Sequence, residues 1–425
     1  IHRNAFIIRI VPARTTLFSA LLIILLNIPG YSTIRYVKAG NPNPIAPYTS
    51  WATASDSIQK VVDLCLSGDT ILIGTGVYTE LVVSISVGRY LTILGVDVDS
   101  CIIDISGYSS GIPPNPIYTR AFSLKDHLTI RNLTFKTQMG STEHSGLVLV
   151  DNYNSVTECS ISNLKFIGKF STGLGTGKVT GKIEDCYFYG CTEAIQLDFT
   201  HSLDIIIVQN NIFQKCGYGI SADYAMIRNN WLLELRSNGF DFSNLFFATE
   251  VYAYNNLLST SSSLAWIGIW HCELGEIINN VVSGFEYGIE PYPGATIKNN
   301  VIKDSWISAI KVGQSEFNAD INYNLFYNNP QISNNLFRFN PDTTIYYTAD
   351  PMFENQDSNN FLLQMFSPLI NAGDPNILDV DGSRSDVGLY GGPYGQSYQY
   401  KDLAPKKPKF THATSPPTPL LTSGE

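Results

Sequence analysis

From about residue 210 to residue 326 the chain repeats a short phrase, in which two asparagines precede two bulky apolar residues. The second asparagines of the copies follow one another after 19, 26, 24, 20 and 24 residues, at Asn211, Asn230, Asn256, Asn280, Asn300 and Asn324. A unit this short cannot bury a core alone, so it must stack on its neighbours. The pattern therefore predicts a solenoid.

Each unit contains three short apolar runs, and none has the 3.6-residue period of a helix. In one copy the runs begin at Gly219 and cover residues 225–227 and 231–233. Three strands per unit predict an all-β fold, a single-stranded parallel β-helix whose coils are spaced by about 4.8 Å. At roughly 24 residues per coil, the stretch from Thr70 to Phe353 holds about a dozen coils.

The repeated asparagines are expected to stack as a ladder at one corner of the coil. An asparagine tolerates the left-handed conformation of a tight corner, and its amide can bond to an identical amide one coil away. The alternative is a row of sugar-binding amides. Upstream, the same phase assigns the corner to Asn132, Cys159 and Cys186, so we expect Cys159 and Cys186 to be neighbours in adjacent coils.

Residues 54–66 have apolar side chains at helical spacing. This predicts a short capping helix at the N-terminal end of the solenoid, with Ser55 or Asp56 as its N-cap and Gly68 at its end.

Several phrases resemble those of a known family. They are GDTILIGTGVYTE at 68–80, LTILG at 91–95, CIID at 101–104, SPLINAGDP at 367–375 and DVDGSRSDVGLYGGP at 379–393. In these phrases the chain is similar to the right-handed parallel β-helix proteins of the pectin-lyase-like superfamily, of the bacterial surface or secreted type. The resemblance implies one β-helix domain over residues 33–395, including an N-terminal cap (33–68) and a closing segment (350–395).

Both ends of the chain differ from the repeats. Residues 1–32 combine Arg3, Arg9 and Arg14 with an apolar run at 17–28, which predicts a signal peptide. An uncleaved anchor is the alternative. Residues 396–425 are predicted to be a proline-rich linker or tail. Such a linker indicates either a further C-terminal module that attaches the protein to the cell surface, or a natural tail. We therefore expect a secreted or extracellular surface protein.

The formal net charge is −10, and removal of the three arginines in residues 1–32 makes it about −13. An acidic chain without clustered bases in its repeats argues against nucleic acid as a partner. The seven cysteines are an odd number, and no disulfide is assigned. We expect a monomer.

The repeat also aligns one sheet of the coil, with runs that begin at Ile195, Ile220, Phe240, Ile269, Ile289 and Ile310. Alternation points the second and fourth residue of each run outward. Polar and aromatic side chains then share one face, which suits an extended polysaccharide. The predicted substrate-binding residues are Asp198, Asp223, Trp270 and Tyr292. An ordinary solvated sheet face is the alternative.

Catalysis on this face is assigned to Asp241, Glu290 and Lys311. Asp241 and Glu290 are two coils apart, or about 9.6 Å, near the upper limit for an inverting carboxylate pair. Lys311 beside Glu290 could be the base of a lyase, or only a surface ion pair. His271 falls on an inward position, where it is either buried or displaced by a bulge.

Two classes of function stay open. In the first, the protein binds a polysaccharide along this sheet, with or without cleaving it, and as an enzyme it would be a polysaccharide lyase or a glycoside hydrolase. In the second, it is a non-catalytic surface or adhesion protein or a structural spacer. The compact aspartate and arginine motifs of the family's well-known enzymes are absent from the sequence. A calcium site is predicted at Asp379, Asp381 and Asp386, where acidic residues alternate around Gly382. The alternative is a cap loop in which these side chains bond to the backbone and Arg384 is paired internally.

Overall fold

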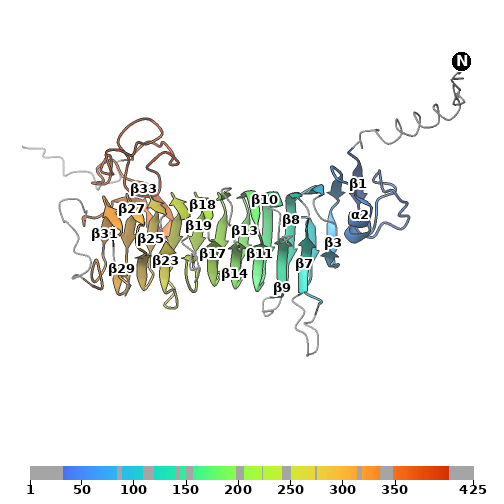
Figure 1. The fold of residues 1–425 in the computed structure, drawn as a ribbon, viewed down its shortest axis with the longest axis horizontal. Helices are drawn as coiled ribbons and strands as arrows, with labels where there is room; N and C mark the ends of the chain where they lie inside the picture. Colours follow the sequence, from blue (N-terminus) through green and yellow to red (C-terminus); the bar gives the residue numbers. More distant parts are fainter. Residues whose placement is uncertain are drawn as a thin grey trace, which may run out of the picture.

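The structure is a computed structural model, and it describes residues 32–83, 89–108, 119–125, 127–138, 144–149, 157–197, 205–222, 224–241, 250–272, 275–313, 318–335 and 348–401. Parallel strands stack side by side into a long rod, with the N-terminal cap at one end (Figure 1). Within the described residues, no helix is long and apolar enough to cross a membrane. The predicted signal peptide lies outside the described residues.

One face of the rod is a ten-stranded parallel sheet, called here the ten-stranded sheet. Its strands are β4 (Val82–Val83), β7 (Thr119–Leu124), β9 (His144–Leu149), β11 (Thr172–Thr176), β14 (Glu193–Leu197), β17 (Tyr218–Ala222), β20 (Phe240–Asp241), β23 (Ile267–Cys272), β26 (Tyr287–Pro291) and β29 (Ser308–Ile310).

The remaining strands of the coils form one large bent sheet of 21 strands. They are β1 (Ile34–Val37), β2 (Thr70–Ile73), β3 (Gly76–Tyr78), β5 (Tyr90–Gly95), β6 (Cys101–Asp104), β8 (His127–Lys136), β10 (Thr157–Ile167), β12 (Val179–Glu184), β13 (Tyr187–Tyr189), β15 (Ile206–Gln209), β16 (Ile212–Gln214), β18 (Tyr224–Arg228), β19 (Trp231–Leu233), β21 (Glu250–Tyr254), β22 (Leu257–Ser259), β24 (Glu276–Ile278), β25 (Val281–Ser283), β27 (Thr296–Lys298), β28 (Val301–Lys303), β30 (Asp320–Asn322) and β31 (Leu325–Tyr327).

A coil consists of one strand of the ten-stranded sheet followed by two strands of the large sheet. The unit β17, β18 and β19 contains the three runs predicted at 219, 225–227 and 231–233, so the predicted three-strand repeat is confirmed. Each strand pairs in parallel with its equivalent in the next coil, as β18 does with β21. The sequence-based fold class is therefore correct.

Inward-facing apolar residues fill the solenoid as one continuous cluster. Phe135, Phe166, Phe188 and Phe213 occupy the same position in successive coils, with ring centroids 5.1, 4.8 and 4.9 Å apart and nearly parallel planes. Identical side chains in successive coils stack at the spacing of the coils. A phenylalanine that packs well in one coil therefore favours a phenylalanine at the same position of the next coil.

The asparagine ladder is confirmed. All six predicted members are fully buried, and the Nδ2 of each of the first five donates to the Oδ1 of the next asparagine at 2.9–3.0 Å. The left-handed conformation belongs to the preceding residue: Asn210, Asn229, Asn255, Asn279 and Asn299 have φ between 53° and 58°. The first asparagine therefore makes the corner, and the second forms the ladder.

The assignment of Asn132, Cys159 and Cys186 to the ladder corner was only partly correct. Cys186 lies in the ladder column, because its N–H donates to Asn211 Oδ1. Asn132 has φ 62° and is a corner residue, one position before the column. Cys159 pairs with Leu128 and lies inside β10, so it is not the neighbour of Cys186 that we expected. The error arose because β10 (11 residues) runs through Cys159, the position where a corner was predicted, and ends only at Ile167.

The predicted capping helix is present but shorter, as α2 (Ile58–Leu64), and it buries Ile58, Val61 and Val62. Its N-cap is Ser57 and not Ser55 or Asp56. Ser55 is instead held in an extended conformation by backbone bonds to Tyr36 and Lys38. The helix is capped at its C-terminal end by Cys65, three residues before the predicted Gly68.

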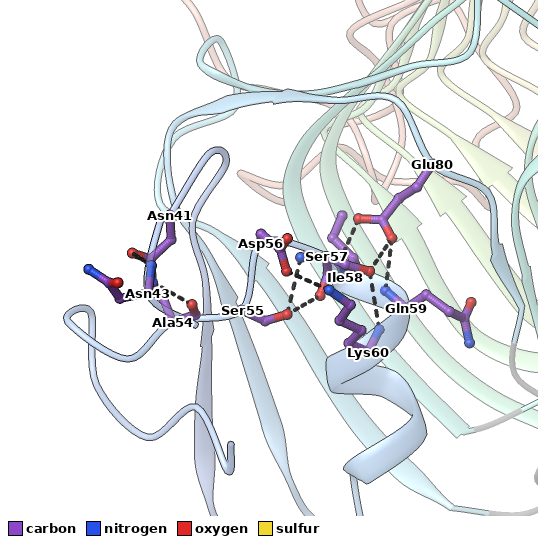
Figure 2. Close-up of polar contacts among 10 residues, drawn as sticks. All are labelled: Asn41, Asn43, Ala54, Ser55, Asp56, Ser57, Ile58, Gln59, Lys60 and Glu80. Carbon is purple, nitrogen blue, oxygen red and sulfur yellow. Dashed lines mark hydrogen bonds and ion pairs between the residues drawn. The ribbon is translucent and has the colours of Figure 1, made fainter. Parts of the chain in front are cut away.

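A carboxylate from the first coil completes the start of α2. Glu80 accepts hydrogen bonds from the N–H groups of Ile58 and Gln59 and from the Ser57 hydroxyl, at 2.6–3.1 Å (Figure 2). An anionic acceptor at this place satisfies free N–H groups and interacts favourably with the positive end of the helix dipole. The cap is thereby attached to the solenoid.

The closing segment lies along the side of the last coils and contains β32 (Phe353–Asn355), the 3₁₀ turn Gln356–Ser358 and β33 (Asn360–Leu363) (Figure 1). It buries a second apolar cluster on the outer surface of the large sheet, which includes Leu257, Val281, Val301 and Leu325. Asn255 and Asn279 donate to its main-chain carbonyls, for example to Leu389 and Gly388.

Candidate functional site

The ten-stranded sheet has the register that the sequence predicted. Ile195, Ile220, Phe240, Ile269 and Ile289 pair in succession from coil to coil, and Ile289 pairs with Ile310. The next position forms a column along the sheet, which contains Gln196, Ser221, Asp241, Trp270 and Glu290. Asp241 and Glu290 are therefore two coils apart, with Trp270 between them.

Lys311 and Glu290 form an ion pair within an aromatic cluster. Lys311 Nζ lies 3.0 Å from Glu290 Oε2, and the two side chains are only 20% and 8% exposed. The ammonium group also lies over the rings of Trp266 (4.3 Å to the centroid) and Tyr287 (5.1 Å). Partial burial strengthens both the ion pair and the cation–π contacts, so they stabilise this arrangement more than an exposed pair would.

Trp266 immediately precedes strand β23, and Trp270 lies within it. Their ring centroids are 5.2 Å apart, and their planes make an angle of 64°. Trp266 is 37% exposed. Trp306 lies just before β29, two coils further along the rod, and is 41% exposed. Burial, with Glu286 and Glu290 nearby, raises the pKa of Tyr287, which therefore stays a neutral hydrogen-bond donor at neutral pH.

We call Trp266, Trp270, Tyr287, Glu290 and Lys311 the aromatic–ion cluster. The sequence alignment placed Trp270, Glu290 and Lys311 on this face but missed Trp266 and Tyr287. Both lie just before the aligned runs, where the strand enters the sheet. The signal that could have found them is the second tryptophan four residues before Trp270.

The other predicted residues of this face are described only in part. Asp241 ends β20, and only its backbone is described. Asp198 and Asp223 lie outside the described residues. Tyr292 follows β26 and is partly buried. Their roles in substrate binding and catalysis stay predictions.

The backbone of β23 is irregular at His271. Trp270 pairs with Glu290 but Cys272 pairs with Pro291, so one extra residue is inserted in β23. This β-bulge is the second of the two arrangements considered for His271, and not the regular inward position that the alternation favoured. Only the backbone of His271 is described.

The carboxylates of the closing segment are bound to the protein itself. Asp379 accepts from the N–H groups of Asp386 and Gly392, and Asp381 accepts from Ser383. Asp386 accepts from Asn371 N–H and from the Tyr400 hydroxyl. Burial raises the pKa of Asp379 to about 6 and also raises the pKa of Asp386.

These bonds correspond to the alternative in which the loop is held by Asp side chains. Arg384 is paired internally, through its Nε and the carbonyl of Gly373 at 2.6 Å. The described residues contain no group of three or more His, Cys, Asp or Glu side chains that could hold a metal ion. Calcium at Asp379, Asp381 and Asp386 therefore stays a prediction, and the geometry does not add to it.

A cavity of about 300 Å³ lies on a different side of the rod, between the corner asparagines and the closing segment. Asn210, Asn229, Trp231, Tyr390 and Gln396 are among the residues that line it. It is separate from the ten-stranded sheet and was not predicted.

Comparison with known families supports the fold. A family model described as "Right handed beta helix region" matches residues 121–267. Together with the parallel coils, this match confirms the predicted right-handed parallel β-helix fold. No curated protein sequence matches the chain.

Solved structures with a related shape include three enzymes. Pectate lyase Pel9A has 14% identity and a TM-score of 0.46, over 85% of this chain and 97% of that one. A mutant of the PL6 family alginate lyase AlyGC has 14% identity and a TM-score of 0.39, over 81% and 58%. A GH136 lacto-N-biosidase from Eubacterium ramulus has 14% identity and a TM-score of 0.39, over 75% and 67%. At this level of similarity, none of them argues for a particular reaction of this chain.

Proposed function

We propose that this protein binds a polysaccharide along the outer face of the ten-stranded sheet, at the coils of β20 to β29. The observation that carries the proposal is the aromatic–ion cluster, which presents two adjacent indole rings on an otherwise polar sheet. Aromatic faces stack on the C–H faces of sugar rings, and neighbouring polar groups bond to the hydroxyls.

The cluster is held in place before any ligand arrives. Lys311 contacts Trp266, Tyr287 and Glu290 at the same time, so movement of one ring would break several contacts. A rigid aromatic site loses little conformational entropy on binding, and this improves affinity. From the cluster, which lies at the β29 end, the ten-stranded sheet continues through β20, β17 and β14 toward the N-terminal cap, and this suits a chain of sugars better than a single one.

Cleavage of the bound polysaccharide is the second candidate. It is favoured by Asp241 and Glu290, which are two coils apart on opposite sides of Trp270. Two coils correspond to about 9.6 Å, near the upper limit for an inverting pair of carboxylates. A lyase base at Lys311 would require the ammonium group to lose a proton, because only the neutral amine has a free lone pair.

The non-catalytic surface or adhesion rod is the rival function. A rod of this kind needs only an evenly polar face, and it gives no reason to place Trp266 and Trp306 where each exposes more than a third of its surface. We also propose that the protein is exported and works outside the cell as a monomer. Export rests on the leader-like residues 1–32.

The test is a panel of polysaccharides, with binding followed by calorimetry and cleavage followed by new reducing ends and by the absorbance of unsaturated products. We expect wild-type protein to bind at least one member of the panel. Trp270→Ala should weaken binding about tenfold or more, which corresponds to ~1.4 kcal/mol. Trp51→Ala is the matched control, since Trp51 is 40% exposed but lies in the N-terminal cap. Absence of binding across the panel would leave the surface rod as the better account.

New reducing ends that disappear in both Asp241→Asn and Glu290→Gln would add hydrolysis to the proposal. Binding without products would limit the protein to a binding role.

A further inference from the structure

Lys311 is the single Lys or Arg in the described residues 260–272, 284–295 and 304–313, which form and flank strands β23, β26 and β29. The same residues contain three carboxylates, Glu286, Glu290 and Asp304. Asp304 pairs with Lys303, and Glu290 pairs with Lys311.

The positive charge of Lys311 is already neutralised by Glu290. Its Nζ donates to Glu290 Oε2 at 3.0 Å and lies over the rings of Trp266 and Tyr287. The lysine side chain is 20% exposed and the glutamate 8%, so a ligand would have to displace a buried carboxylate to reach the ammonium group. Breaking a pair that is this well buried leaves an uncompensated charge, which is costly.

A carboxylate or sulfate on a sugar would therefore meet the carboxylate of Glu286 and, in the described residues of these three coils, no Lys or Arg on this face except the paired Lys311. Asp241, one coil from Trp270, adds a further acidic residue to the same column. A sugar with only hydroxyl or acetamido groups meets no such opposition, because it stacks on the rings and bonds to acidic and phenolic oxygens as a donor.

We infer that the ligand of this face is a glycan without acidic groups, built from neutral or N-acetylated sugars. This inference rests on the proposed function. It excludes polymers of uronic acids, whether bound directly or through a bridging cation.

The experiment compares neutral, N-acetylated and uronate polysaccharides by calorimetry, each with calcium and with EDTA. We expect binding in the first two classes, unaffected by EDTA and nearly constant between about 0.05 and 0.5 M salt, since screening acts on charged partners. Tighter binding of a uronate polymer, in EDTA or only with calcium, would overturn the inference and leave the proposed function intact. A protein that binds no glycan contradicts both.

A pair of variants tests the role of Lys311 directly. Glu290→Gln removes the carboxylate that neutralises Lys311, and it should create or raise affinity for uronate polymers about tenfold. Glu286→Gln changes the net charge by the same amount but leaves the ion pair intact. It should therefore not raise the affinity for uronate polymers. An equal gain in both variants would show that only total charge matters and that the pairing of Lys311 does not. If Glu290→Gln fails to fold, the wild-type panel still decides the inference.

Discussion

Replacing Asn256 by alanine should destabilise the solenoid more than almost any other single polar substitution in the coils. Asn256 lies in the middle of the ladder and is fully buried. Its Oδ1 accepts from Asn230 N and Nδ2, both at 3.0 Å, and its Nδ2 donates to Ile227 O at 2.8 Å and to Asn280 Oδ1 at 2.9 Å. Alanine removes all four bonds.

The magnitude follows from the partners that remain. Asn230 Nδ2 keeps Val208 O, and Asn280 Oδ1 keeps the Asn256 N–H. The Asn230 N–H loses its acceptor, and Ile227 O loses its side-chain donor, at positions that water does not reach. A buried polar group without its partner costs about 1–3 kcal/mol, so we expect a loss of about 2–6 kcal/mol in the free energy of unfolding.

The assay is urea denaturation followed by circular dichroism, together with hydrogen exchange at the Asn230 amide. Asn210→Gly is the control, since Asn210 is exposed, its side chain makes no hydrogen bond to the described residues, and glycine accepts its φ of 57°. It should change stability by less than about 0.5 kcal/mol. The reasoning is refuted if Asn256→Ala is as stable as this control and exchange at Asn230 is unchanged.

Three further outcomes are expected. Gly268→Ala should cost about 1–3 kcal/mol, because its Cβ would lie 2.3 Å from a buried valine methyl, whereas Gly107→Ala, with no atom within 4 Å, should be nearly neutral; thermal unfolding compares them. In a Cys272→Ser background, iodoacetamide should label no thiol before unfolding, because the other six cysteines are buried and burial raises the pKa of Cys159 to about 12; fast labelling of native protein would contradict this. The pKa of Asp379 is raised to about 6 in the folded state, so the native protein binds more protons than the unfolded chain between about pH 4 and pH 6. Its contribution to stability should thus fall as pH rises through that range, and Asp379→Asn should remove this decline from melting curves recorded between pH 4 and pH 7.

Much of the fold was predictable because each coil repeats one local pattern. The period of two in Ile289-Glu290-Pro291 and its equivalents predicted which residues face inward, and the pairing of the ten-stranded sheet confirms that register. The spacing of the second asparagines predicted the ladder for the same reason. Errors appeared where the pattern weakens: Cys159 was misplaced because an eleven-residue strand runs through the corner.

The candidate site was predictable only in part. Adjacent coils place Lys311 beside Glu290, and this neighbourhood follows from the repeat. The burial of that pair does not, because it depends on Trp266 and Tyr287, which lie outside the aligned runs. The bulge at His271 was likewise one of two possibilities that alternation alone could not separate.

The sequence by itself determined the repeat, the inward face and the ladder, because these depend on contacts between nearest-neighbour coils about 24 residues apart. The tertiary structure alone decided which outward residues are covered. Ile212, Leu257 and Val281 hold the same position in their coils, yet Ile212 is 41% exposed and the other two are buried beneath the closing segment. That segment is held by contacts such as Asn279 to Gly388, 109 residues apart, and no local period encodes a contact across such a distance.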